Sequence, residues 1–125
     1  MYQLEKIGDN SFFFKVIGSF PPSIAREAIE EFLSITKVLN DFSAIIDISD
    51  GRLISLDSIE IIVDFFKHNE PKLKKSAIII SENPPLDSEF KFILEKVDST
   101  KRKIVKNLEE AKEWIGLNEI IIQKD

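Results

Sequence analysis

The sequence contains no cysteine and a single histidine, His68, among its 125 residues. Without cysteine, the chain has no disulfide, thiol nucleophile, thiolate metal site or iron–sulfur cluster. His68 stands near the end of an expected helix, and no flanking nucleophile and acid indicate a catalytic triad. These absences predict a chain that is not an enzyme, with no catalytic residue, no metal and no cofactor.

Glycine and positive charge are also in short supply. None of the four glycines stands in a G-x-G or G-K-[ST] context, so neither common type of nucleotide-binding loop is indicated. The 17 Lys and Arg residues against 22 Asp and Glu residues give a formal net charge of −5. Because binding to a phosphate backbone needs a net basic face, we expect no nucleic-acid partner.

Long apolar runs are missing as well. No run approaches the ~20 residues of a membrane span, and the start, Met1-Tyr-Gln-Leu-Glu-Lys, has neither the basic beginning nor the apolar stretch of a signal peptide. We therefore expect no membrane span and a soluble, cytoplasmic protein. With 43% hydrophobic residues, ten of them Phe, the chain suffices for one packed domain.

What is present alternates between strand and helix signals. An expected hairpin, 2–6 and 11–17, is followed by a helix from Ser23 to about Leu39, a strand 43–49, a helix from Asp57 to Asn69, a strand 76–80, a helix after Pro85, a strand 103–105 and a helix after Asn107. The order ββαβαβαβα predicts an α/β fold with a five-stranded mixed sheet and about four helices. The domain would span residues 1–117, and the tail 118–125 would add a strand or a dimer contact.

Two helix starts are marked by capping patterns. Asp57 and Glu60 have the spacing of a capping box, with Leu56 and Ile61 placed for a hydrophobic staple. Asn107 and Glu110 repeat the box before the last helix, and Gly116 ends that helix.

The stretch from Ser43 to Glu60 reads as strand, loop and capped helix. Its polar residues Asp47, Ser49, Asp50, Asp57 and Ser58 lie where a parallel strand gives way to a helix N-terminus, the part of an α/β fold that commonly meets ligands or partners. Carboxylates at a strand end can hold Mg²⁺, but the acidic pair of a receiver site is missing after the first strand. We therefore expect no metal there.

The chain resembles the STAS family of anti-sigma-factor antagonists, and within it the small stand-alone bacterial members of unassigned role. The resemblance covers roughly residues 2–117 and rests on the element order, on Asp47-Ile-Ser49, on the Asp57-Ser58 pair and on the closing segment 107–116. It implies regulation through protein contacts, switched in some members by phosphorylation of a Ser just after an Asp at the second helix start.

Ser58 matches that phospho-acceptor position, where a phosphate would meet the positive end of the helix. Ile59 and Glu60 follow it where phosphorylated members carry a small Ser-Gly-type pair, and this departure weighs against kinase recognition. The alternative is that Ser58 is an ordinary first-turn residue with Asp57 as the cap.

The sequence leaves open two alternative functions, which belong to different classes of protein. In the first, a regulatory domain binds a protein partner, or itself, through a surface predicted to contain Ser49, Asp50, Arg52, Asp57 and Ser58. In the second, a cleft at the carboxyl ends of the strands binds an apolar or anionic metabolite, with ligand-binding residues predicted to be Gly18, Ser19, Ser49 and Ser81.

Two further surfaces are expected. Phe92, Trp114 and the tail segment 120–122 could form an exposed apolar patch that favours a homodimer. Two basic clusters, which we expect to be solvated surface, consist of Lys72, Lys74 and Lys75 and of Lys101, Arg102, Lys103 and Lys106.

Overall fold

The strands and helices follow one another in the predicted order. The computed structural model describes residues 1–80 and 84–116. Its strands are β1 (Tyr2–Lys6), β2 (Ser11–Gly18), β3 (Phe42–Gly51), β4 (Leu73–Ile79) and β5 (Arg102–Val105). Its helices are α1 (Pro22–Thr36), α2 (Leu56–Asn69), the short 3₁₀ turn η1 (Glu70–Lys72), α3 (Pro84–Val97) and α4 (Leu108–Ile115). The predicted α/β class and the order ββαβαβαβα are confirmed.

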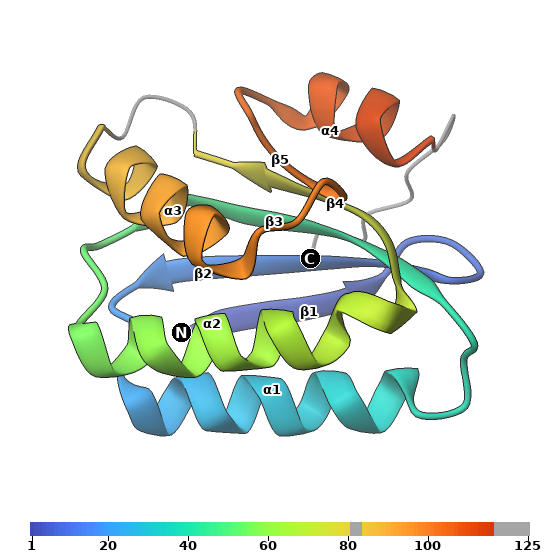
Figure 1. The fold of residues 1–125 in the computed structure, drawn as a ribbon, viewed down its shortest axis with the longest axis horizontal. Helices are drawn as coiled ribbons and strands as arrows, with labels where there is room; N and C mark the ends of the chain where they lie inside the picture. The colour runs from blue at the N-terminus through green and yellow to red at the C-terminus, as the bar shows by residue number, and fades with distance from the viewer. Residues whose placement is uncertain (81–83, 117–125) are drawn as a thin grey trace.

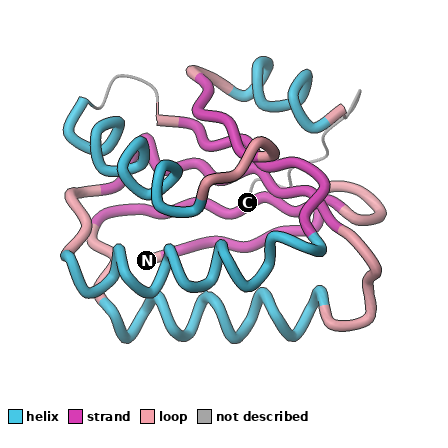
Figure 2. Tube along the Cα trace, in the orientation of Figure 1, coloured by secondary structure: helices cyan, strands magenta, loops and turns pink. Residues whose placement is uncertain are grey.

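The sheet has the simplest possible order, β1-β2-β3-β4-β5. The hairpin β1–β2 is antiparallel and every other neighbouring pair is parallel. Because each crossover from β2 to β5 steps in one direction and crossovers are right-handed, α1, α2 and α3 fall on the same face. Figure 1 shows these three helices over one face of the sheet, and Figure 2 shows the sheet lying between them and α4.

Both faces of the sheet are therefore covered, and β2, β3 and β4 bury apolar side chains on both of them. Phe12 and Phe14 pack on the side of α1 to α3, whereas Phe13 packs with Ile45 and Ala111 on the side of α4. A strand covered on both faces can carry three consecutive phenylalanines, because successive side chains point to opposite faces of the sheet. None of the helices in residues 1–80 and 84–116 is long and apolar enough to cross a bilayer.

The start of α2 differs from the predicted one by two residues. Ser55 is the N-cap, and its Oγ accepts a hydrogen bond from the backbone N–H of Ser58 at 3.2 Å. The predicted capping box of Asp57 and Glu60 is therefore wrong, and so is the staple, since Leu56 is 67% exposed. Ile54 and Ile59, which belong to one core cluster, occupy the staple positions of a helix capped at Ser55.

The ends of α1 and α4 agree with the predicted ones only in part. At α1, Pro21 is the N-cap and Pro22 the first helical residue, so the predicted Ser23 cap is wrong, and the helix ends at Thr36, before Leu39. At α4 the predicted cap and the terminal glycine are confirmed: Asn107 Oδ1 accepts from the Glu110 N–H at 3.0 Å, and Gly116 follows in the left-handed region at φ 80°. The other half of the predicted box differs, because Glu110 Oε2 accepts from the Lys106 N–H at 2.6 Å and not from that of Asn107.

Candidate functional site: the loop between β3 and α2

The predicted site residues begin within β3, which continues two residues beyond the expected end. Asp50 and Gly51 pair with Ile17 and Gly18 of β2, after a shift in register between Lys15 and Ile17. One residue of β2, Val16, thus faces two of β3, Ile48 and Ser49, which is the pattern of a bulge. The bulge includes Ser49 and changes the direction in which the end of β3 leaves the sheet. The loop proper consists of residues 52–55.

Asp47 and Ser49 are hydrogen-bonded to each other. Asp47 Oδ1 accepts hydrogen bonds from the backbone N–H of Ser49 at 3.0 Å and from Ser49 Oγ at 2.5 Å. Asp50 forms an ion pair with Lys15 at 3.1 Å. No cluster of three potential metal ligands occurs among the residues that the structure describes.

The loop is held in place from two sides. The backbone N–H of Arg52 donates to the carbonyl oxygen of Gly18 at 2.9 Å, and the N–H of Ile54 donates to Glu89 Oε1 on α3 at 3.0 Å. Gly18 lies at φ 74°, where glycine is favoured because other residues are strained there. Since Ile54 is also buried, the conformation of the loop is fixed by contacts at both ends and at its centre.

Between these fixed points the loop presents apolar side chains to solvent. Leu53 is 62% exposed and Leu56 is 67% exposed, and Arg52, Asp50 and Asp57 beside them are exposed as well. No surface role was predicted for the two leucines. The signal for their exposure was the run Leu53-Ile54-Ser55-Leu56 before a helix. When Ile54 is buried, the leucines on either side of it face outward.

Ser58 lies in the first turn of α2, but its side chain points into the protein. The residue is fully buried, and its Oγ donates to the carbonyl oxygen of Phe20 at 2.8 Å and accepts from Ser55 Oγ at 3.2 Å. Of the five residues predicted to bind a partner, Ser58 alone has no exposed surface. Asp57, which precedes it, is exposed.

The structure does not show the residues of the predicted ligand cleft as one connected group. Gly18 and Ser49 lie on adjacent strands, Ser19 is exposed, and Ser81 lies outside the described residues. The tail 118–125 also lies outside them. Phe92 is on α3 and Trp114 on α4, on opposite faces of the sheet, so the predicted patch that joins these two side chains is wrong.

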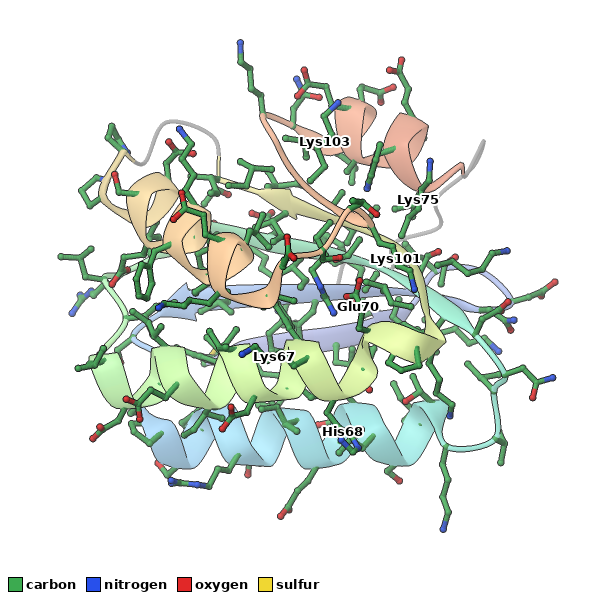
Figure 3. The ribbon with its side chains drawn as sticks, in the orientation of Figure 1. Lys67, His68, Glu70, Lys75, Lys101 and Lys103 are labelled. Atoms are coloured by element: carbon green, nitrogen blue, oxygen red, sulfur yellow. The ribbon has the colours of Figure 1, made fainter. Side chains whose placement is uncertain are left out.

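The two basic clusters are not all solvated surface. Lys72 Nζ donates to the carbonyl oxygen of Thr36 at the end of α1 at 3.1 Å, and Lys101 Nζ donates to that of Glu70 at 2.8 Å. Figure 3 shows Glu70 and Lys101 beside one another where α2 ends, with Lys75 and Lys103 near α4. The prediction was wrong for Arg102, which is buried.

Comparison with solved structures places this architecture among known folds. A DUF3478-family protein from Shewanella loihica with a SpoIIAA-like fold is 17% identical, with 91% of each chain covered and a TM-score of 0.70. The anti-sigma-factor antagonist SpoIIAA in its unphosphorylated form is 10% identical over 93% of this chain and 96% of that one, at 0.63. A proposed anti-sigma-factor antagonist from Thermotoga maritima is 19% identical over 90% and 92%, at 0.61.

These similarities show that the chain has the SpoIIAA-like, or STAS, fold, as the sequence resemblance implied. No protein-family model matches the sequence, and a search of curated proteins finds no significant match.

Proposed function

We propose that this chain is a non-enzymatic regulatory domain that binds a protein partner through the surface formed by Asp50, Arg52, Leu53, Leu56 and Asp57. This set is called the β3–α2 surface below. It keeps the exposed members of the predicted partner site and adds the two leucines. The observation that carries the proposal is the exposure of Leu53 and Leu56 on a loop whose backbone is held by Gly18 and Glu89.

Both the exposed apolar area and the ordered backbone of the loop favour the binding of a partner. Two neighbouring leucines in water leave apolar area that a partner could bury, worth ~25 cal/mol per Å² before association costs. Because the loop is already ordered by its hydrogen bonds, a partner would lose little entropy in fixing it. Charged residues of both signs around an apolar centre are typical of a polar rim.

The fold supports the regulatory part of the proposal. One of the similar solved structures is an anti-sigma-factor antagonist and another is a proposed one, and proteins of that kind act by binding other proteins. Phosphorylation of Ser58 remains a prediction. In the conformation described, a kinase cannot reach its hydroxyl without opening the first turn of α2, so we propose partner binding that does not depend on this modification.

The test compares two surface variants of the tagged protein. Leu53→Ser with Leu56→Ser alters the proposed surface, and Val38→Ser is the control because Val38 is 88% exposed after the end of α1. We expect a partner captured by the wild type from its own cells to be lost with the double variant and retained with the control. The same order should hold for the purified partner in a binding titration.

Equal capture by all three proteins would contradict the proposed surface. Intact-mass measurement of the recovered bait gives the second readout. An unmodified mass together with a bound partner agrees with binding independent of phosphorylation, whereas an added phosphate on Ser58 in the bound fraction would contradict that part of the proposal.

A further inference from the structure

On the face of the sheet that carries α4, buried side chains extend beyond the strands on which α4 packs. The helix lies on β4 and on its neighbours β3 and β5, and Figure 1 shows it on the β5 side of the sheet, away from β1. Ile7, which follows β1, and Phe13 of β2 are nevertheless only 5% and 8% exposed, and both belong to the core cluster of this face. Because β1 lies two strands away from β3, the burial of Ile7 needs a further cover.

Glu5 gives a second, independent observation on the same part of the sheet. It pairs with Phe13 across the hairpin, so its side chain lies on the α4 face. Glu5 Oε2 is shut off from water and has no hydrogen-bond partner among the residues that the structure describes. A carboxylate oxygen without water or a donor is costly to bury. The oxygen therefore indicates a cover that carries N–H donors and belongs to neither 1–80 nor 84–116.

The last turn of α4 brings the chain to the right end of the sheet. Trp114 donates its indole N–H to the carbonyl oxygen of Ser76. Ser76 lies in the same row across the sheet as Phe12, near the start of β2. Gly116 then ends the helix in the left-handed region, where the chain changes direction. The chain therefore leaves α4 at the same end of the sheet as Phe13.

The nine residues after Gly116 have the composition that such a cover needs. Their sequence is Leu-Asn-Glu-Ile-Ile-Ile-Gln-Lys-Asp, residues 117–125. The apolar run 120–122 suits the apolar side chains of Ile7 and Phe13, and the amide, lysine and backbone groups supply N–H donors. Ile122 comes six residues after Gly116, a reach of about 20 Å in an extended chain. The three strand spacings from β4 to β1 amount to only about 14 Å.

We propose that the C-terminal segment 117–125 docks on its own sheet, with the isoleucines 120–122 over Ile7 and Phe13 and an N–H group of the segment donating to Glu5 Oε2. The segment thereby completes the layer that α4 begins. A segment that can reach its own sheet meets it at a far higher effective concentration than the sheet of a second copy. The proposal does not depend on the proposed function, because the β3–α2 surface lies at the other end of β3.

The experiment uses the full chain with a nitroxide spin label on Gln123→Cys, which is unique because the chain has no other cysteine. Backbone amide signals are measured by NMR before and after chemical reduction of the label. We expect the amides of Glu5 and Phe13 to lose most of their signal while the label is paramagnetic. The amide of Lys103, on β5 at the opposite edge and about 19 Å from β1, should lose far less.

A mixed sample separates the chain's own segment from that of a second copy. Isotope-labelled wild type is combined with spin-labelled chain that carries no isotope, so only contacts between copies can broaden a signal. We expect the amides of Glu5 and Phe13 to keep their full signal in this sample.

Variants of the spin-labelled chain test the apolar run. The combined substitutions Ile120→Ser, Ile121→Ser and Ile122→Ser should reduce the signal loss at Glu5 and Phe13 to that at Lys103. Ile35→Ser, at an isoleucine 40% exposed on α1, is the matched control and should leave the signal loss unchanged. Unchanged amide positions in α1, α2 and α3 show that each variant keeps its fold.

Three results would overturn the proposal. The first is a full signal at Glu5 and Phe13 in the spin-labelled chain. The second is the same signal loss in the triple serine variant as in the unsubstituted segment. The third is a loss of signal at Glu5 in the mixed sample, which would assign the cover to a second copy.

Discussion

Ser58 and Tyr2 form buried and exposed hydrogen bonds whose consequences can be measured separately. Ser58 Oγ donates to the carbonyl oxygen of Phe20 and joins the start of α2 to the segment before α1. Tyr2 donates its hydroxyl to Glu31 Oε1 at 2.7 Å and joins β1 to α1. Each contact connects segments that are far apart in the sequence.

Substitutions at Ser58 should differ sharply in their effect on stability. Ser58→Ala removes one buried hydrogen bond and should lower the free energy of unfolding by ~1–2 kcal/mol. Ser58→Asp places a carboxylate against the Phe20 carbonyl oxygen and should cost more, ~3 kcal/mol or above. Urea unfolding measures both. The exposed Asp57→Asn is the control, with an expected loss under ~1 kcal/mol.

Equal stability of Ser58→Asp and Ser58→Ala would show that this side chain can reach solvent. That result would favour Ser58 as an accessible phosphorylation site.

The single tyrosine, Tyr2, should lose its phenolic proton at a higher pH than an ordinary tyrosine. The hydrogen bond to Glu31, with smaller contributions from burial and from nearby negative charge, raises the pKa of Tyr2 from 10.0 to about 12. The folded state therefore holds the phenolic proton more tightly than the unfolded state does. Its stabilisation is complete below pH 10 and is lost as the pH rises from 10 to 12.

Near-ultraviolet absorbance of tyrosinate measures this titration without interference from a second tyrosine. Glu31→Gln should move the midpoint back toward 10.0, the ordinary value. A wild-type midpoint already at that value would contradict the hydrogen bond.

The elements differ in how fully local sequence specifies them. At α4, the cap, the acidic first turn and the terminal glycine all agree, and the helix forms where predicted. At α2, Ser55, Asp57 and Ser58 are all capping residue types, and Ile54 and Leu56 are both apolar. The choice of Ser55 follows from the burial of Ile54 in the core, a contact that local sequence does not reveal.

The N-cap of α4 should be individually important. Asn107→Ala removes the side-chain acceptor for the Glu110 N–H and should lower the free energy of unfolding by ~1 kcal/mol. Urea unfolding again measures the change. Glu113→Ala, exposed on the same helix, should change it by less than ~0.5 kcal/mol. A loss at Asn107 no larger than at Glu113 would contradict the capping role.

At the scale of the whole molecule, the two helical layers are joined through the sheet. Trp114 of α4 donates its indole N–H to the carbonyl oxygens of Ser76 at 2.9 Å and Lys101 at 3.2 Å. Lys75 lies over the same ring at 4.2 Å. Because Ser76 lies on β4, beneath the other helical layer, loss of either layer should disturb the strand that both use.

We therefore expect a single cooperative unfolding transition. Fluorescence of the one tryptophan reports on α4, and far-ultraviolet circular dichroism reports on all helices. The two curves should superimpose in urea, as two-state unfolding requires. A fluorescence transition at lower urea would instead show that α4 separates from the sheet before the rest unfolds.

By itself the sequence determined the order and type of the elements, because the apolar periodicity of strands and helices and the proline and glycine punctuation are local signals. It also located the loop between β3 and α2. Only the tertiary structure decided which side chains face outward there. Leu53 and Leu56 are exposed and Ser58 is buried because Ile54 and Ser58 are held by contacts with α3 and the Phe20 carbonyl. Arg102 was misplaced for the same reason: its partners Phe66 and Glu70 are distant in sequence, and pairing between distant residues leaves no local pattern.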